Sequence, residues 1–475
     1  MRGLRAGLLA AVCAAAGCKD NPGFILLPDG PSPAETTSVG PGTGEPPADS
    51  SSSVAPETTE SPTSTTGDPE TSTTDPPPAK CGDEHVDVER GEQCDDGNDI
   101  PHDDCTNDCR HLFVKLDPLQ VAGTCIGLLA APIDPGNEDP DLLLVDNLNP
   151  VVHVLENDGA GNMFDAGHGF TTGQGPAIAA ITHDLDLENG KDVLSINNIV
   201  SVCINDPDLL YCTDQVDYAA PDLMGFFDDF LQVDNMDNDL KGAPDVVGIG
   251  NFGESLAIMK GLGMGLFDMT MIKSLDFPDD IANGAPTALA VGAFTGSVEY
   301  PDVAVGYKTG TGKVMLFADV GLSNLEQKLG PFMIGSSVTS IAITDFGVGG
   351  DLGDIVVTDP VGGRLVYLSD IGNAGLEPQD EFITIGPLEQ KVVVGPLRGD
   401  APRDIVTVDV GGSFIHVAAV LDGKLPEDAY DFDTELAGLV DVVLADLDGD
   451  GDGDIAVVNT ECKVRVLLNQ TVVKP

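Results

Sequence analysis

The chain has 475 residues, with 79 acidic and 22 basic side chains and a formal net charge of −57. Such a charge repels nucleic acid, phosphate-rich polymers and anionic membranes, so partners should be neutral or cationic. Hydrophobic residues make up 41% of the chain, which suffices for a core, but the absence of Trp argues against an aromatic platform for sugars.

Residues 1–17 are typical of an export signal. Arg2 and Arg5 precede an apolar run that is too short to span a bilayer as a mature helix. The run ends in AAGC at residues 15–18, which resembles a bacterial lipobox. The resemblance implies cleavage before Cys18 and a lipid on Cys18, which would anchor the chain to the bacterial outer membrane or cell surface. Ordinary signal-peptide cleavage nearby is the alternative, and either route permits disulfides.

Residues 18–80 form the next segment, which is rich in Pro, Thr, Ser, Gly and acidic residues. A segment of this composition buries too little apolar surface to pack a core, so we expect a disordered tether. A tether that follows a lipidated cysteine would hold the later domains away from the membrane. The membrane would then be contacted only through the lipid.

Residues 81–110 contain four cysteines, Cys81, Cys94, Cys105 and Cys109. Zinc binding would be the more specific function for these cysteines, but their spacing is not that of a common zinc site. Two disulfides fit an exported chain better. The stretches CGD and GEQCDDGN resemble the cysteine-rich repeat of myxobacterial surface proteins. That resemblance implies a small disulfide-rich module at the cell surface.

Residues 111–475 contain a repeated motif, which is an aspartate followed by a short apolar strand. Successive aspartates are 51, 53, 57, 52, 50 and 50 residues apart. Another apolar strand precedes each aspartate, a third follows in nearly every unit, and room remains for a fourth. Four strands per unit of about 50 residues are typical of a β-propeller blade, so we predict an all-β fold with seven blades. The repeated aspartates are Asp141, Asp192, Asp245, Asp302, Asp354, Asp404 and Asp454.

The two ends of the repeat array predict how the ring closes. The last unit lacks an outer strand, and residues 111–119 read as one, so the N-terminal segment should complete the last blade and leave no open edge. Cys125 begins the first unit and Cys462 follows the second strand of the last, so a disulfide between them could lock the closure. Cys203 and Cys212 are the remaining candidates, in an expected insertion of blade 2.

The sequence DLDGDGDGD at residues 446–454 has aspartates at every second position, as a calcium loop requires. An EF-hand is excluded because its bidentate Glu would fall on Val457 and because strands flank the loop. The loop resembles the calcium loop of FG-GAP/VCBS propeller repeats, as in the integrin α-subunit head. The resemblance implies side-chain ligands from Asp446, Asp448, Asp450 and Asp454, a backbone carbonyl from Asp452, and a structural role for the ion.

Two other units contain related loops. The blade 2 loop consists of Asp184, Asp186, Glu188 and Asp192, and the blade 3 loop of Asn235, Asp237, Asp239 and Asp245. Blade 5 keeps only Asp345, Asp351 and Asp354, and the remaining blades lack the set. We therefore expect structural calcium at blade 7 and related sites at blades 2 and 3. The alternative is that these acidic residues are there because they favour turns.

No catalytic constellation is visible in the sequence. The seven histidines have no metal-site spacing, the sequence GYKTGTGK at residues 306–313 departs from a P-loop, and the RGD at residues 398–400 reads as a degenerate loop. We expect a monomeric, non-enzymatic, surface-displayed protein that binds or adheres to a protein or glycan. The alternative is an extracellular hydrolase whose active site is assembled across blades at the propeller channel.

Overall fold

The computed structural model describes most of the chain from residue 81 to residue 470. The signal peptide and the tether predicted for residues 1–80 lie outside it, as do several loops. The described residues are 81–83, 85–88, 92–95, 97, 105, 109–133, 138–173, 175–187, 190–197, 199–205, 214–218, 231–236, 242–250, 255–276, 286–294, 301–307, 312–318, 326–346, 353–370, 376–385, 390–397, 403–420, 425–426 and 429–470.

The chain forms seven antiparallel sheets that together make a seven-bladed β-propeller, as the repeat predicts. The first strands are β3 (Cys125–Ala131), β7 (Ala179–His183), β11 (Leu231–Asp234), β15 (Pro286–Gly292), β19 (Ile341–Thr344), β23 (Gln390–Gly395) and β27 (Leu439–Ala445). The second strands are β4 (Asp141–Asp146), β8 (Asp192–Ile196), β12 (Asp245–Gly250), β16 (Asp302–Tyr307), β20 (Asp354–Asp359), β24 (Asp404–Asp409) and β28 (Asp454–Asn459). Every second strand begins at one of the repeated aspartates.

The third and fourth strands complete the blades. The third strands are β5 (Val151–Asn157), β9 (Val200–Ile204), β13 (Ser255–Gly263), β17 (Lys313–Ala318), β21 (Arg364–Asp370), β25 (Phe414–Ala418) and β29 (Lys463–Asn469). The fourth strands are β6 (Met163–Thr171), β10 (Asp214–Tyr218), β14 (Leu266–Asp276), β18 (Glu326–Met333), β22 (Leu376–Thr384) and β26 (Tyr430–Asp433). The described residues include no helix long and apolar enough to cross a bilayer.

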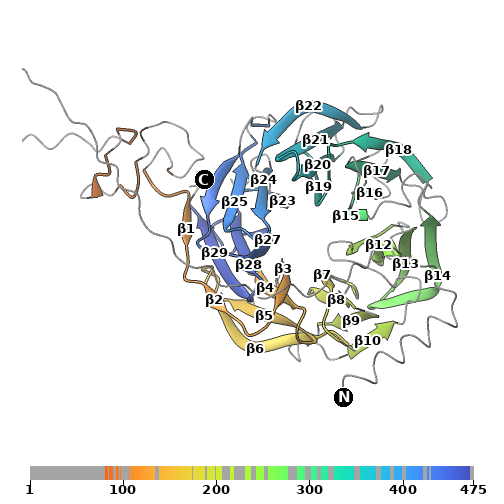
Figure 1. Ribbon diagram of the computed structural model, residues 1–475. Coiled ribbons are helices and arrows are strands. Elements are labelled where there is room, and N and C mark those ends of the chain that lie inside the picture. Colours follow the sequence, from red (N-terminus) through yellow and green to blue (C-terminus); the bar gives the residue numbers. More distant parts are fainter. Residues whose placement is uncertain are drawn as a thin grey trace, which may run out of the picture. The chain divides into compact units, whose positions relative to one another are not determined.

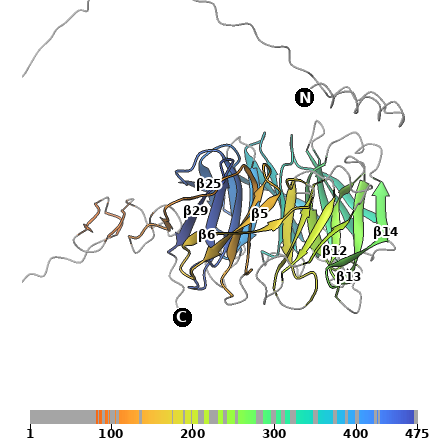
Figure 2. The same cartoon turned by 90° about the horizontal axis from the view of Figure 1, so that it is seen from below.

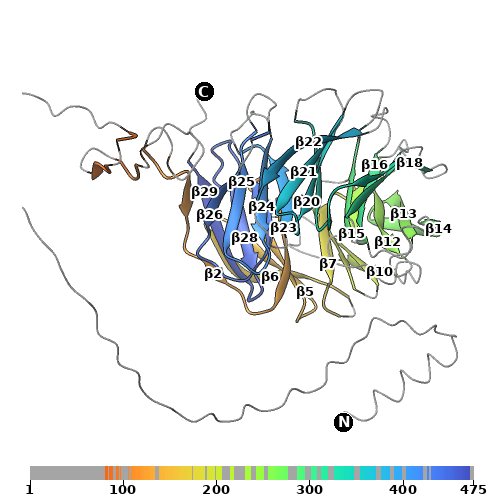
Figure 3. The same ribbon diagram turned by 45° about the horizontal axis from the view of Figure 1, so that its top comes forward.

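The blades stand around a ring with their first strands innermost (Figure 1; Figure 3). Each first strand contacts the first strand of the next blade, and β27 of blade 7 contacts β3 of blade 1. Hydrophobic core lies between neighbouring blades, so that Val458 and Val466 of blade 7 cluster with Leu128 and Leu144 of blade 1. The fold is therefore held by burial between blades as well as by pairing within them.

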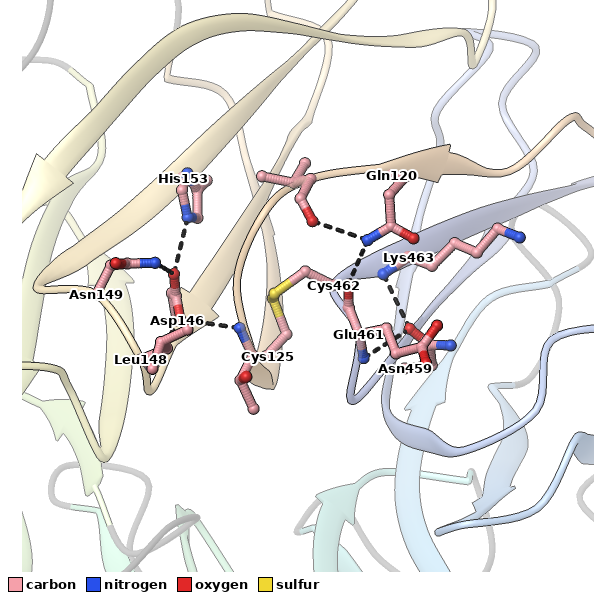
Figure 4. The surroundings of a disulfide bond; sticks show 12 residues. Gln120, Cys125, Asp146, Leu148, Asn149, His153, Asn459, Glu461, Cys462 and Lys463 are labelled. Carbon is pink, nitrogen blue, oxygen red and sulfur yellow. Dashed lines mark hydrogen bonds and ion pairs between the residues drawn. A yellow bond between two sulfur atoms is a disulfide. The ribbon is translucent and has the colours of Figure 1, made fainter.

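The N-terminal segment closes the ring as predicted. Strands β1 (Phe113–Lys115) and β2 (Leu119–Gln120) both pair antiparallel with β29. Cys125 and Cys462 form the expected disulfide, with an S–S distance of 2.11 Å. Beside it, the Gln120 side-chain amide donates to the carbonyl oxygen of Glu461 (Figure 4).

The other cysteines among the described residues also form disulfides. Cys81 pairs with Cys109, and Cys94 pairs with Cys105, as expected for a disulfide-rich module. Cys203 is disulfide-bonded, but it lies in β9, a core strand of blade 2. The prediction that it belongs to an insertion was wrong, because a short, unusual third strand was mistaken for a loop. Cys212 lies outside the described residues.

The repeated aspartates have a structural role of their own. All seven are at most 2% exposed. In blade 1, the Asp141 carboxylate accepts the N–H of Ile133 at 3.0 Å and the N–H of Asn157 at 2.9 Å. Asp245 of blade 3 likewise accepts two backbone N–H groups, from Met236 and Gly261. A buried carboxylate needs such donors. In blades 1, 2, 3 and 7 this aspartate thus joins the turn after the blade's first strand to the end of the third strand or the residue that follows it.

The antiparallel order places turns on two opposite faces of the ring, which are seen edge-on in Figure 2. We call the loop face the one that carries the turns after the first and third strands. The closure face carries the turns after the second strands, including Cys462. The Cys125–Cys462 disulfide is therefore on the closure face, and the aspartate loops are on the loop face.

Candidate metal centre

The loop between β27 and β28 gathers three carboxylates. Oxygens of Asp446, Asp448 and Asp454 all lie within 4.8 Å of one another. Asp454 is held by its role in the fold, because it accepts the N–H groups of Leu447 at 2.7 Å and Asn469 at 2.8 Å. The carboxylate that starts the strand is therefore fixed before any ligand binds.

Asp446 is positioned by the glycines of the loop. Its carboxylate accepts the N–H of Gly449 at 2.8 Å and that of Gly451 at 3.1 Å. Both glycines have positive φ, 74° and 97°, a region that favours glycine. The alternating Asp-Gly pattern thus turns the chain tightly enough to aim several carboxylates inward.

Asp450 and Asp452 lie in different surroundings within the loop. Asp450 is exposed and is not one of the three clustered carboxylates, although it was expected to be a ligand. Asp452 was expected to contribute its backbone carbonyl, but its side chain is only 1% exposed. Within the described part of the chain, neither oxygen of its carboxyl group has a hydrogen-bond partner. Such an orphaned carboxyl is rare in a folded core.

The electrostatics of the loop are unfavourable without a cation. Burial raises the pKa of Asp454 to about 7, although its backbone hydrogen bonds oppose the shift. Burial, with the nearby carboxylates of Asp450, Asp454 and Asp448, raises the pKa of Asp452 to about 8. Clustered carboxylate oxygens are hard donors that suit Ca²⁺, and a bound cation would favour their ionised form. The residues present therefore fit the ion.

The blade 2 loop has nearly the same geometry. Oxygens of Asp184, Asp186 and Asp192 lie within 4.8 Å of one another. Asp192 accepts the N–H of Leu185 at 2.7 Å, and Asp184 accepts the N–H of Leu187 at 2.7 Å, as their counterparts do in blade 7. Burial raises the pKa of Asp192 to about 6. Glu188 lies outside the described residues.

The remaining predicted loops are only partly described. In blade 3, the Asn235 side-chain oxygen is buried and has no hydrogen-bond partner among the described residues, while Asp237 and Asp239 lie outside them. Asp245 is buried as the first residue of β12. In blade 5, Asp345 and Asp354 are described and Asp351 is not. The described residues bring three carboxylates together only at blades 2 and 7 among the aspartate loops.

Asparagine side chains tie these loops to the neighbouring blades, a feature that the sequence analysis missed. Asn157 of β5 donates to the carbonyl oxygen of Leu447 in the blade 7 loop at 2.8 Å. Asn205, just after β9, donates to the carbonyl oxygen of Ile133 in blade 1 at 2.9 Å. Asn469 of β29 reaches Leu397 of blade 6 in the same way. The signal was present in the sequence, because an Asn is the last residue of the third strand or the residue directly after it in all three blades.

The central channel offers little chemistry in the described part of the chain. A cavity of about 280 Å³ is lined by first strands from all the blades. The charged residues among its lining are Lys391 and Asp441, which pair at 3.0 Å. Asp441 also accepts the N–H of Leu128, and the Ser340 hydroxyl accepts the N–H of Val392. The side chains of Lys391, Asp441 and Ser340 thus form hydrogen bonds and an ion pair that hold neighbouring blades together.

The buried histidine of blade 6 has both ring nitrogens engaged. His416, 5% exposed, has Nδ1 at 2.6 Å from Asp431 and Nε2 at 2.9 Å from Asp409. With a carboxylate in contact with each ring nitrogen, neither nitrogen is free to take a proton from a substrate. This arrangement braces the outer strands of the blade and does not form an acid–base pair.

No protein-family model and no curated protein matches the chain. Among solved structures, it is similar to a crystal structure of BBS1N in complex with ARL6DN, soaked with mercury, at 9% identity and a TM-score of 0.53. The similarity covers 77% of this chain and 99% of that one. A lead-soaked crystal of the same complex gives 9% identity and a TM-score of 0.49, over 76% and 97% of the two chains. At this identity the likeness defines the fold alone, a β-propeller.

Proposed function

We propose that the chain is a calcium-braced β-propeller that is displayed at the cell surface and binds another protein. The observation that carries the calcium assignment is the cluster of Asp446, Asp448 and Asp454, with the orphaned, buried carboxyl of Asp452 beside it. Asp184, Asp186 and Asp192 repeat the arrangement in blade 2. These residues would hold the ions, whose positive charge would offset the repulsion among the carboxylates.

Several features support the binding role. BBS1N, which has a similar fold, was crystallised in complex with ARL6DN. The charged side chains that line this channel, Lys391 and Asp441, are paired with each other, which favours binding over hydrolysis there. The absence of Trp favours a protein ligand over a glycan. The signal-like residues 1–17 and a lipid on Cys18 would place the propeller outside the cell on a tether.

Calorimetric titration of residues 75–475, one compact unit, tests the calcium assignment. Ca²⁺ should bind at two sites at least. Replacing Asp446 and Asp448 by Asn should remove one site, and the same change at Asp184 and Asp186 should remove the other. Heats that these substitutions leave unchanged would refute the assignment. Protein and glycan arrays, with and without chelator, together with a panel of hydrolase substrates, test the binding role against the enzymatic alternative.

A further inference from the structure

Four exposed apolar side chains gather on the loop face over blades 2 and 3. Leu187, in the blade 2 aspartate loop, is 46% exposed. Leu262, Met264 and Leu266, at the turn between β13 and β14, are 46%, 69% and 44% exposed. A hydrogen bond of 2.9 Å from the N–H of Gly265 to the carbonyl oxygen of Leu185 joins the two loops. We call these four residues the apolar patch.

Two of the four residues are held in a conformation that large side chains avoid. Leu187 has φ 66° and Met264 has φ 58°. The blade 7 loop has Gly449 at the position of Leu187, with φ 74°. A left-handed backbone costs an L-residue roughly 1–2 kcal/mol, so Leu is the less stable choice there. Exposed leucine and methionine at strained positions indicate a role other than stability.

The turn between β13 and β14, which carries three of the patch residues, is packed against blade 2. The ring of Tyr218, on β10, meets that of Phe267 edge-on at 5.8 Å, and its hydroxyl accepts the N–H of Phe267 at 3.2 Å. A side chain at Gly265 would lie 2.2 Å from the Cδ1 atom of Ile204. The patch is therefore preformed, which reduces the entropy lost on binding.

We propose that the apolar patch is the docking site for a protein segment that presents apolar side chains flanked by Lys or Arg. The apolar anchors would cover the patch. The basic flanks would match the chain's net charge of −57. A second copy of this chain would bring the same negative charge, so self-association through the patch is disfavoured.

This inference rests on the proposed function, because it specifies the kind of protein that the propeller would bind. The patch is also mechanically linked to the blade 2 loop, because the N–H of Leu187 is bonded to the Asp184 carboxylate at 2.7 Å. An ion held by Asp184, Asp186 and Asp192 would fix the loop that carries Leu187.

The test uses residues 75–475 and three labelled nonapeptides at about 0.15 M salt, where long-range attraction is largely screened. One peptide alternates Leu and Lys, one alternates Leu and Glu, and one alternates Ser and Lys. Fluorescence anisotropy measures each dissociation constant. The patch variant combines Leu187→Gly with Met264→Ser, and Val361→Ser is the matched control because Val361 is also 69% exposed. Leu187→Gly relieves strain, and circular dichroism verifies folding.

The Leu–Lys peptide should bind best, and the patch variant should bind it roughly tenfold or more weakly. Val361→Ser should leave its binding unchanged. The proposal is overturned if the patch variant binds as the unchanged chain does, if the Leu–Glu peptide binds equally, or if no peptide binds below about 1 mM. Repeating the titration in EGTA separates the two proposals. Patch-dependent binding that survives chelation supports the patch while contradicting its bracing by calcium.

Discussion

Asn157 and Asp454, from opposite ends of the propeller sequence, hold the same residue from two sides. The Asp454 carboxylate accepts the N–H of Leu447 at 2.7 Å, and the Asn157 amide donates to the carbonyl oxygen of Leu447 at 2.8 Å. Leu447 itself is 1% exposed. Blade 7's aspartate loop is thereby connected to blade 1 on the loop face, while the disulfide joins the same two blades on the closure face.

Replacing Asn157 by Ala should weaken this seam. The substitution leaves the buried carbonyl of Leu447 without its donor, a loss of roughly 1–3 kcal/mol in the free energy of unfolding. Urea unfolding of residues 75–475 measures it. Asn162→Ala is the control, because Asn162 is exposed and its side chain bonds only Asp158, in the same turn, among the described residues. Equal effects of the two substitutions would contradict a bridging role for Asn157.

Removing the closure disulfide should destabilise the ring far more. Cys125 and Cys462 are 337 residues apart, and loop-closure entropy for such a separation corresponds to about 5–6 kcal/mol as an upper value. A variant with Ser at both positions should therefore unfold at clearly lower urea concentration than the oxidised chain. Reduction of the unchanged chain should lower the midpoint at least as far, because it also breaks the Cys81–Cys109 and Cys94–Cys105 disulfides. A midpoint unaffected by the substitutions would show that β1 and β2 alone close the ring.

Asp141→Asn tests the structural role of the repeated aspartate in a blade without a calcium loop. Asn keeps one acceptor oxygen but points an amide N–H₂ at a backbone donor, so the unfolding free energy should fall by roughly 1–3 kcal/mol. The loss should be the same in calcium and in EGTA. Asp165→Asn, at an exposed position, should change stability by less than about 0.5 kcal/mol. A loss that appears only in calcium would assign Asp141 to a metal site.

Without calcium, the stability of the propeller should fall as the pH rises. Burial raises the pKa of Asp192, Asp454 and Asp452 from 3.8 to about 6, 7 and 8. The folded state therefore binds more protons than the unfolded state between about pH 4 and 8, and stability is lost across that window. Urea unfolding of protein that has been freed of calcium by EGTA at pH 8 and then exchanged into calcium-free buffers should give a lower midpoint at pH 8 than at pH 5. A higher midpoint at pH 8 would be inconsistent with these shifts.

The sequence predicted the fold because the repeat length and the strand order are properties of the chain itself. Seven units of about 50 residues allow few architectures, and a last unit without its outer strand predicts closure by the N-terminal segment. The Cys125–Cys462 pairing was predicted from the same closure, which brings the first and last blades side by side. These inferences needed no knowledge of side-chain packing.

The features that the sequence analysis missed depend on tertiary contacts. The sequence analysis considered the repeated aspartates only as possible calcium ligands. In the structure, the carboxylates of Asp141 and Asp404 accept backbone N–H groups. Nothing in the local sequence indicates that Asp452 is buried. The exposure of Met264 likewise depends on how β13 and β14 pack against blade 2.

The most direct test of the central claim is the melting temperature of residues 75–475 in 1 mM calcium and in EGTA, about a thousandfold excess over a micromolar site. Such an excess stabilises the folded state by about 4 kcal/mol per site, so the melting temperature in calcium should be higher by several degrees. Asp446→Asn should reduce the difference without lowering the melting temperature in EGTA. Identical melting temperatures in calcium and in EGTA would contradict a calcium-braced propeller.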